Sequence, residues 1–208
     1  MSEAVRTEAA ERAHVYALLA TVFRCPLDGP QLERLRTPSL LGAMVDAGID
    51  PGEDFVSGEA NIVLDRLAID YTQLFHMSAN RIIPYEGLQT GKNNQLMGAA
   101  AHSVRDFLAQ AGYAILPESG ELPDHISVEL VFMSELAHRE AEAALAGDRE
   151  TAEYAVALQR RFLDEHLGRW AGRFAGKVRS AASTPFYRGM AALLAGLIAD
   201  EHADQTTQ

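Results

Sequence analysis

The sequence predicts an all-helical protein, built as a single-domain bundle of about eight to ten helices. Apolar residues recur with the period of about 3.6 residues that is typical of helices, along most of the chain. No stretch alternates apolar and polar residues between hairpin turns, as strands would require. The 208 residues are 48% apolar, enough for one large core, and neither a long repeat nor a Gly/Ser-rich linker divides them. We therefore expect residues 1–208 to form one domain.

The first helices can be placed from their apolar stripes and their stop signals. One is expected at residues 7–24, directly before a Cys-Pro pair. A second, at residues 31–47, is interrupted by Pro38 and ended by Gly48. The third has the most regular spacing of apolar residues and ends near His76.

The helical period is lost in residues 77–92. This segment contains Pro84, Gly87 and Gly91, all of which disfavour a continuous helix. Connections this long within compact domains are often functional. We therefore treat the segment as a candidate site.

The remaining helices are predicted largely from their capping residues. Asp124 resembles an N-cap, because its carboxylate can accept a bond from the first helical turn. Gly147 is a stop signal, Asp148 can cap the next helix, and Thr184 before Pro185 is a strong start signal. A second loop is expected at residues 117–123. The helices themselves are expected at residues 93–111, 124–146, 148–167, 169–181 and 185–201.

Charge and cysteine content restrict the partners and the compartment. The net charge of -11 and the pI near 5.0 disfavour nucleic acid and favour basic partners, although an acidic surface also simply aids solubility. The single cysteine, Cys25, cannot form an intramolecular disulfide and suits a reducing compartment. The first residues carry acids and show no secretory signal, and the apolar stretch at residues 190–199 is too short to span a membrane. We therefore expect a cytoplasmic protein with no membrane span.

Motifs for catalysis are absent from the sequence. It contains no phosphate-binding loop, dinucleotide fingerprint, nucleophile elbow, CxxC or HExxH pattern. His125 and Glu129 stand at i, i+4 and could, with His166, hold a metal in a helical-bundle hydrolase, but no second such pair completes a site. The plainer interpretation is a capping Asp124 and a surface His-Glu pair. We expect no catalytic residue, no metal and no cofactor.

Apolar and aromatic residues, joined by one acid, continue from the third helix into the loop that follows. Tyr71 and Phe75 lie on the helix, and Pro84, Tyr85 and Glu86 lie in the loop. Such a group suits a peptide that carries both apolar and basic residues. Two alternatives stay open: the helical pair can be ordinary core, and the loop can be an oligomer interface of a structural subunit.

Three blocks of the sequence stand out together. They are Asp70-Tyr71-Thr72-Gln73-Leu74-Phe75, then Pro84-Tyr85-Glu86, then Pro123-Asp124-His125 followed by Glu129-Leu130-Val131-Phe132-Met133. In the same order, these blocks resemble signatures of the TorD/DmsD/NarJ-like redox enzyme maturation chaperones. Matching residues in the C-terminal third extend the resemblance over nearly the whole chain.

The resemblance implies a TorD-like, all-helical cytoplasmic chaperone that performs no chemistry. Its partner would be the twin-arginine leader of a molybdopterin-dependent enzyme subunit, and binding would delay export until the cofactor is inserted. The client enzyme, and the choice between monomer and dimer, stay open. The residues that the resemblance assigns to leader binding are Tyr71, Phe75, Pro84, Tyr85, Glu86, Asp124 and His125.

A leader with two arginines and an apolar stretch needs both acidic and apolar complements. We therefore add Glu129 and Phe132 to the candidate site. Acidic residues are expected to form a charged rim, and apolar ones an open groove. The rim is expected to comprise Glu86, Asp124 and Glu129, and the groove Tyr71, Phe75, Pro84, Tyr85 and Phe132.

Overall fold

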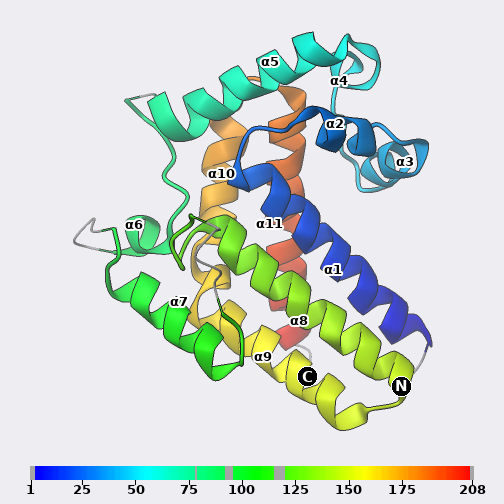
Figure 1. Ribbon diagram of the computed structural model, residues 1–208, viewed down its shortest axis with the longest axis vertical. Helices are drawn as coiled ribbons and strands as arrows, with labels where there is room; N and C mark the ends of the chain where they lie inside the picture. The colour runs from blue at the N-terminus through cyan, green and yellow to red at the C-terminus, as the bar shows by residue number, and fades with distance from the viewer. Residues whose placement is uncertain (1–2, 78, 92–95, 115–119, 207–208) are drawn as a thin grey trace. The chain divides into compact units, whose positions relative to one another are not determined.

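The structure, a computed structural model, is all-helical over the residues that it describes, 3–77, 79–91, 96–114 and 120–206 (Figure 1). These ranges form eleven α-helices, a π-helical segment η1 and a 3-10 turn η3, with one isolated β-bridge and no strand. The expected fold class is thereby confirmed. The elements are α1 (Glu3–Arg24), α2 (Gly29–Leu35), α3 (Pro38–Asp46), α4 (Glu53–Ser57), α5 (Ala60–Thr72), η1 (Gln73–Met77), α6 (Glu86–Thr90), α7 (Ala99–Gln110), α8 (Ile126–Ala146), α9 (Arg149–Glu165), η3 (Leu167–Arg169), α10 (Ala171–Ala181) and α11 (Pro185–Thr206).

Contacts group the chain into two compact units, each assembled from segments that are distant in sequence. The first unit comprises Met1–Arg24 and Pro84–Trp170. The second comprises Cys25–Ile83 and Ala171–Gln208. The single domain expected from the sequence stays a prediction.

Three long helices form the frame of the first unit. Helix α8 packs against α1 on one side and against α9 on another (Figure 1). Helices α1 and α8 run antiparallel, because the Ser134 hydroxyl donates to the Ala13 carbonyl (2.8 Å) while Arg12 reaches Glu140 further along α8 (2.7 Å). Helix α9 returns along α8 after Gly147, whose φ of +75° is a left-handed conformation that glycine adopts without strain.

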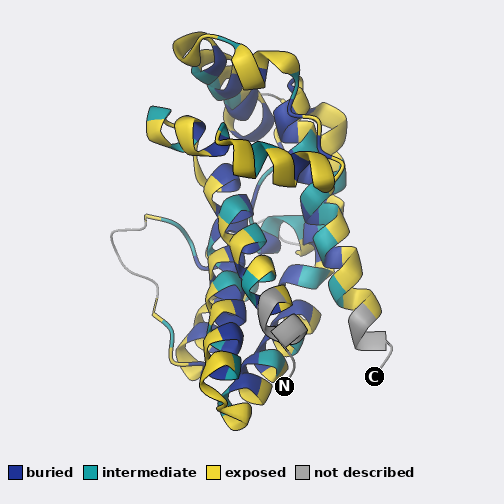
Figure 2. Cartoon of the chain, turned by 90° about the vertical axis from the view of Figure 1, so that its right-hand side faces the viewer, coloured by how far each residue is buried: buried dark blue, intermediate teal, exposed yellow. Residues whose placement is uncertain are grey.

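The core of the first unit is built around packed aromatic rings. Phe132 of α8 stands edge-on to Phe162 of α9 and to Phe107 of α7, with ring centroids 4.8 and 6.0 Å apart. Figure 2 shows that the long helices carry buried residues along one side and exposed residues along the other. This is the amphipathic pattern that the sequence predicts.

In the second unit, an aspartate of the first sequence block holds the start of a helix. Asp70, on α5, is buried, and its carboxylate accepts bonds from the backbone N–H groups of Ser183 (3.0 Å) and Thr184 (2.8 Å). It also accepts the Thr184 hydroxyl (2.6 Å). These donors lie at the N-terminus of α11, so the expected start at Pro185 is confirmed and is stabilised by Asp70 as well.

The structure corrects several boundaries. Pro38 begins α3 rather than interrupting a longer helix, since its missing N–H is harmless in a first turn. Two helices of five residues, α4 and α6, were not expected, and α6 lies within the predicted loop 77–92. The N-cap of α8 is His125 and not Asp124. Part of the loop predicted at residues 117–123 lies outside the described residues.

Candidate functional site

The loop that follows η1 is joined to the segment that precedes α8. The Glu86 N–H donates to the Asp124 carbonyl, and the Ile126 N–H donates to the Pro84 carbonyl, both at 2.9 Å. These bonds form the isolated antiparallel bridge between Tyr85 and His125. The second and third sequence blocks, which both contribute to the candidate site, therefore meet. We call this pairing the bridge.

Side chains at the bridge hold its two segments in place. The ring nitrogen Nδ1 of His125 accepts the Ser127 N–H (3.2 Å), which caps α8, and the Tyr85 ring packs edge-on against the imidazole, 4.9 Å away. The Asp124 carboxylate instead accepts the Gly87 N–H (3.0 Å) at the start of α6. Neighbouring acid and imidazole groups can both cap a helix, and only the path of the loop decides which of them does.

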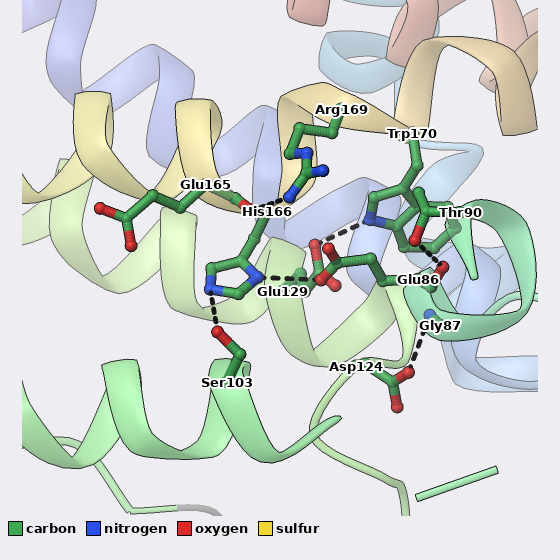
Figure 3. Close-up of polar contacts among 10 residues, drawn as sticks. All are labelled: Glu86, Gly87, Thr90, Ser103, Asp124, Glu129, Glu165, His166, Arg169 and Trp170. Atoms are coloured by element: carbon green, nitrogen blue, oxygen red, sulfur yellow. Dashed lines mark hydrogen bonds and ion pairs between the residues drawn. The ribbon is translucent and has the colours of Figure 1, made fainter. Parts of the chain in front are cut away.

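Behind the bridge lies a buried polar network (Figure 3). Glu86 accepts a bond from His166 at Nδ1 (2.9 Å), and the other ring nitrogen of His166 lies 3.4 Å from the Ser103 hydroxyl. Glu129 accepts the indole N–H of Trp170 (3.1 Å). The carboxylates of Glu86 and Glu129 lie next to each other in the close-up. Four segments of the first unit are thus tied together by polar contacts in its interior.

Burial changes the ionisation of the groups around the bridge. Burial first, and then the negative charge of Glu86, raise the pKa of Glu129 well above its usual value, against the opposing effect of the Trp170 N–H. Burial also raises the pKa of Asp124, while the Gly87 N–H opposes the change. The pKa of Tyr85 is raised by burial and by the charges of Glu121 and Asp124.

The expected acidic rim is wrong in one respect. Glu86, Asp124 and Glu129 retain only 3%, 3% and 0% of their exposure, so they do not face a surface. Their oxygens accept bonds from internal donors. The residues next to an acid in the sequence do not show whether its carboxylate is solvated or bonded to the imidazole or indole of a distant residue.

The structure places the candidate residues in two groups. Seven lie in the first unit, at the bridge or on the first turns of α8. Tyr71 and Phe75 lie in the second unit, where their rings touch each other (4.7 Å) and Phe75 stacks near Phe174. They are 2% and 4% exposed, so they are core side chains and do not line an open groove.

An open apolar hollow of about 250 Å³ lies beside the bridge, between α7, α8 and the end of α1. Leu108, Val128, Val131 and Phe132 supply apolar lining. Phe132 is thus the candidate residue that borders it directly. Val131, which is 49% exposed, presents its side chain to the hollow.

The hollow is bordered by carboxylates as well as by apolar side chains. Glu121 and Glu135 both line it, and Glu121 lies 3.8 Å from Nε2 of His125, so the hollow adjoins the bridge. Ser127, which bonds His125, lines it as well. Sequence reasoning missed both acids. The available signal was Val131, an apolar residue off the core stripe of α8, with an acid one turn later.

The residues proposed for a metal site do not converge. His125, Glu129 and His166 are bonded to Ser127, Trp170 and Glu86 respectively. In the part of the chain that the structure describes, no group of three His, Cys, Asp or Glu side chains could hold a metal ion. Within the same ranges, no helix has the length and apolar character needed to cross a membrane.

Comparison with known proteins follows this geometry. The family model "Nitrate reductase delta subunit" matches residues 41–176. Chaperone protein TorD of Vibrio atlanticus is 24% identical over 88% of this chain and 89% of its own length, and TorD of Shewanella loihica is 28% identical over 88% and 87%. Chaperone protein YcdY of Escherichia coli is 32% identical over 62% and 60%.

A crystal structure of an Archaeoglobus fulgidus protein, assigned to redox enzyme maturation, has the same fold. It superposes with a TM-score of 0.56 and 20% identity, covering 90% of this chain and 93% of that one. The relatives above are chaperones rather than enzymes, which agrees with the expectation of a protein without catalytic activity. By the match of its residues 41–176, the chain belongs to the nitrate reductase delta subunit family, and the TorD-like resemblance of its sequence is confirmed.

Proposed function

We propose that the chain is a cytoplasmic maturation chaperone that binds the twin-arginine leader of a molybdopterin-dependent enzyme subunit. Binding holds export back until the cofactor has been inserted. The names of the chaperone relatives support the class of function. The observation that carries the site is the apolar hollow beside the bridge, with carboxylates at its edge.

The size of the hollow fits part of a peptide better than a complete cofactor. Its volume of about 250 Å³ is below the roughly 300–1,000 Å³ of sites for small ligands. Its lining is mainly apolar, and its two carboxylates, Glu121 and Glu135, outnumber the one cation, Arg24, so its net negative charge complements a basic segment. A leader that has both apolar and basic residues meets both requirements.

The candidate residues divide their work in this proposal. Phe132 contacts the leader from the floor of the hollow. Tyr85 and His125 hold Glu121 at its edge. The buried candidate residues hold the bridge in place through hydrogen bonds to donors inside the unit. They are Pro84, Glu86, Asp124 and Glu129.

Binding is expected to be reversible. One large apolar side chain gains about 1.5–3 kcal/mol on burial. Ordering a flexible leader costs about 2–5 kcal/mol, which offsets the gain from one or two such side chains. From the sum of all contacts along the leader we expect a net affinity of about micromolar, equivalent to roughly 8 kcal/mol. Such a complex dissociates without an energy source once the client is complete.

Titration calorimetry with a synthetic leader tests the site. The probe is a peptide of about 20 residues with an Arg-Arg pair before a leucine-rich stretch. Val131→Glu places a charge in the hollow and is expected to weaken binding at least tenfold. Leu145→Glu is the matched control, because Leu145 is also on α8, is 69% exposed and does not line the hollow. Equal affinities of the two variants would rule out the hollow as the binding site.

A further inference from the structure

A second hollow adjoins the first along α1 and α8. It has a volume of about 210 Å³ and shares Arg24, Val131 and Glu135 with the first hollow. The rest of its wall comes from α1 and from Ser134 of α8. Because three residues border both, the two hollows lie next to each other.

The second hollow exists because small side chains face each other there. Ala17, Ala20 and Thr21 of α1 lie opposite Ser134 of α8. The two hydroxyl groups among them already donate hydrogen bonds: Thr21 to the Ala17 carbonyl (2.9 Å), and Ser134 to the Ala13 carbonyl (2.8 Å). The wall therefore offers space for a short apolar side chain without demanding a polar partner.

Charge marks the junction of the two hollows. Glu135 is exposed and borders both hollows, as does the cation Arg24, whereas Glu121 borders only the first, near the bridge. The linings together thus carry two carboxylates and one guanidinium. Val131 and Glu135 are four residues apart on α8, so they are neighbours on one face, about 6 Å apart along the axis. An occupant that covers Val131 with an apolar group can place a cation beside Glu135.

We propose that the two hollows form one groove for an extended, basic and apolar segment of the client peptide, in which an arginine pairs with Glu135. This assignment rests on the proposed function and adds the register of the bound chain. One apolar side chain enters the first hollow over Val131, and a smaller one lies against Ala17 in the second. In an extended chain, residues two apart are about 6.6 Å apart and point the same way. The groove therefore selects a basic residue two positions from an apolar one.

Reversing the charge at the junction tests the pairing. Calorimetry compares Glu135→Arg with Glu142→Arg, since Glu142 is exposed on the same helix and lines neither hollow. Two probes are used: the peptide with the Arg-Arg pair and the same peptide with both arginines replaced by glutamine. Wild type is expected to prefer the arginine peptide about two- to fivefold, the range of exposed ion pairs.

In Glu135→Arg, we expect the arginine peptide to bind about tenfold more weakly than to wild type, because attraction becomes repulsion. The glutamine peptide should be unaffected, and Glu142→Arg should change neither affinity. In a peptide that keeps a single arginine, two positions from the apolar residue, inserting one glycine between them should abolish the preference, because it turns the basic side chain away. Inserting two glycines should restore part of it.

Equal losses in Glu135→Arg and Glu142→Arg would show a long-range field and would overturn the pairing. The pairing would also be overturned if neither variant changed the affinity for the arginine peptide. If Val131→Glu still weakens binding in that case, the inference fails while the proposed function stands. If wild type binds neither peptide, both fail.

Discussion

Replacing Glu129 with glutamine probes the most unusual group of the buried network. Its carboxyl is 0% exposed; Oε2 accepts the Trp170 indole N–H, and Oε1 accepts no bond. Glutamine has nearly the same shape, keeps an oxygen for the indole and carries no charge. Its amide can also donate to the neighbouring Glu86 carboxylate. Glu129→Gln thus removes the charge while preserving the packing.

The direction of the effect follows from the raised pKa of Glu129. The folded protein holds this proton more tightly than the unfolded chain, whose corresponding pKa is near 4.5. The stability that Glu129 contributes is therefore complete below pH 4.5 and is lost as the pH rises through the folded pKa. Between pH 4.5 and the folded pKa, the loss is at most about 1.36 kcal/mol for each pH unit.

Urea unfolding from pH 5 to pH 8.5 measures this difference. We expect Glu129→Gln to be more stable than wild type by about 1–3 kcal/mol at pH 8, with the two curves converging towards pH 5. For a chain of this length, each kcal/mol corresponds to about 2–4 °C in Tm. Glu135→Gln, at an exposed position of the same helix, should show no such trend.

Two results would refute this reasoning. A Glu129→Gln variant less stable than wild type at pH 8 would mean that the charged carboxylate stabilises the fold. A difference that does not change with pH would mean that Glu129 does not titrate differently in the folded and unfolded states. In either case the network of Glu86, Glu129 and Trp170 would need another electrostatic description.

Two further substitutions test local features of the fold. Asp70→Ala removes the acceptor for three donors at the start of α11. It should lower the free energy of unfolding by about 3 kcal/mol, seen as a fall of about 6–12 °C in Tm. Asp70→Asn should lower it less, and an unchanged Tm in the alanine variant would contradict this role. Gly147→Ala forces a side chain into a left-handed conformation (φ +75°) and should destabilise by about 1 kcal/mol in the same assay, whereas a gain in stability would show that the turn after α8 can change shape.

The long helices could be predicted because their signals are local. The apolar period of α8, the glycine at residue 147 and the aspartate at residue 148 lie within a few residues of what they determine. The helices α4 and α6 escaped prediction because five residues are too few to show a period. Their existence depends on contacts made after the chain has folded back.

The site was predicted only in part, because its chemistry depends on distant partners. The sequence assigned Pro84 and Asp124 to one candidate site, and the bridge brings their segments together. That Glu86 is buried could not be read locally, since its partner His166 lies 80 residues further along the chain. The hollow itself combines α1, α7 and α8, so no single helix pattern shows it.

The most direct test of the account is hydrogen–deuterium exchange of the wild-type protein with and without the arginine peptide. Exchange reports local opening along the backbone, and a bound peptide slows it where it covers or orders the chain. We expect slower exchange at residues 17–24 and 126–135 and no change at residues 149–165. Protection confined to other segments, while calorimetry shows that the peptide binds, would contradict a leader site in the hollow beside α8.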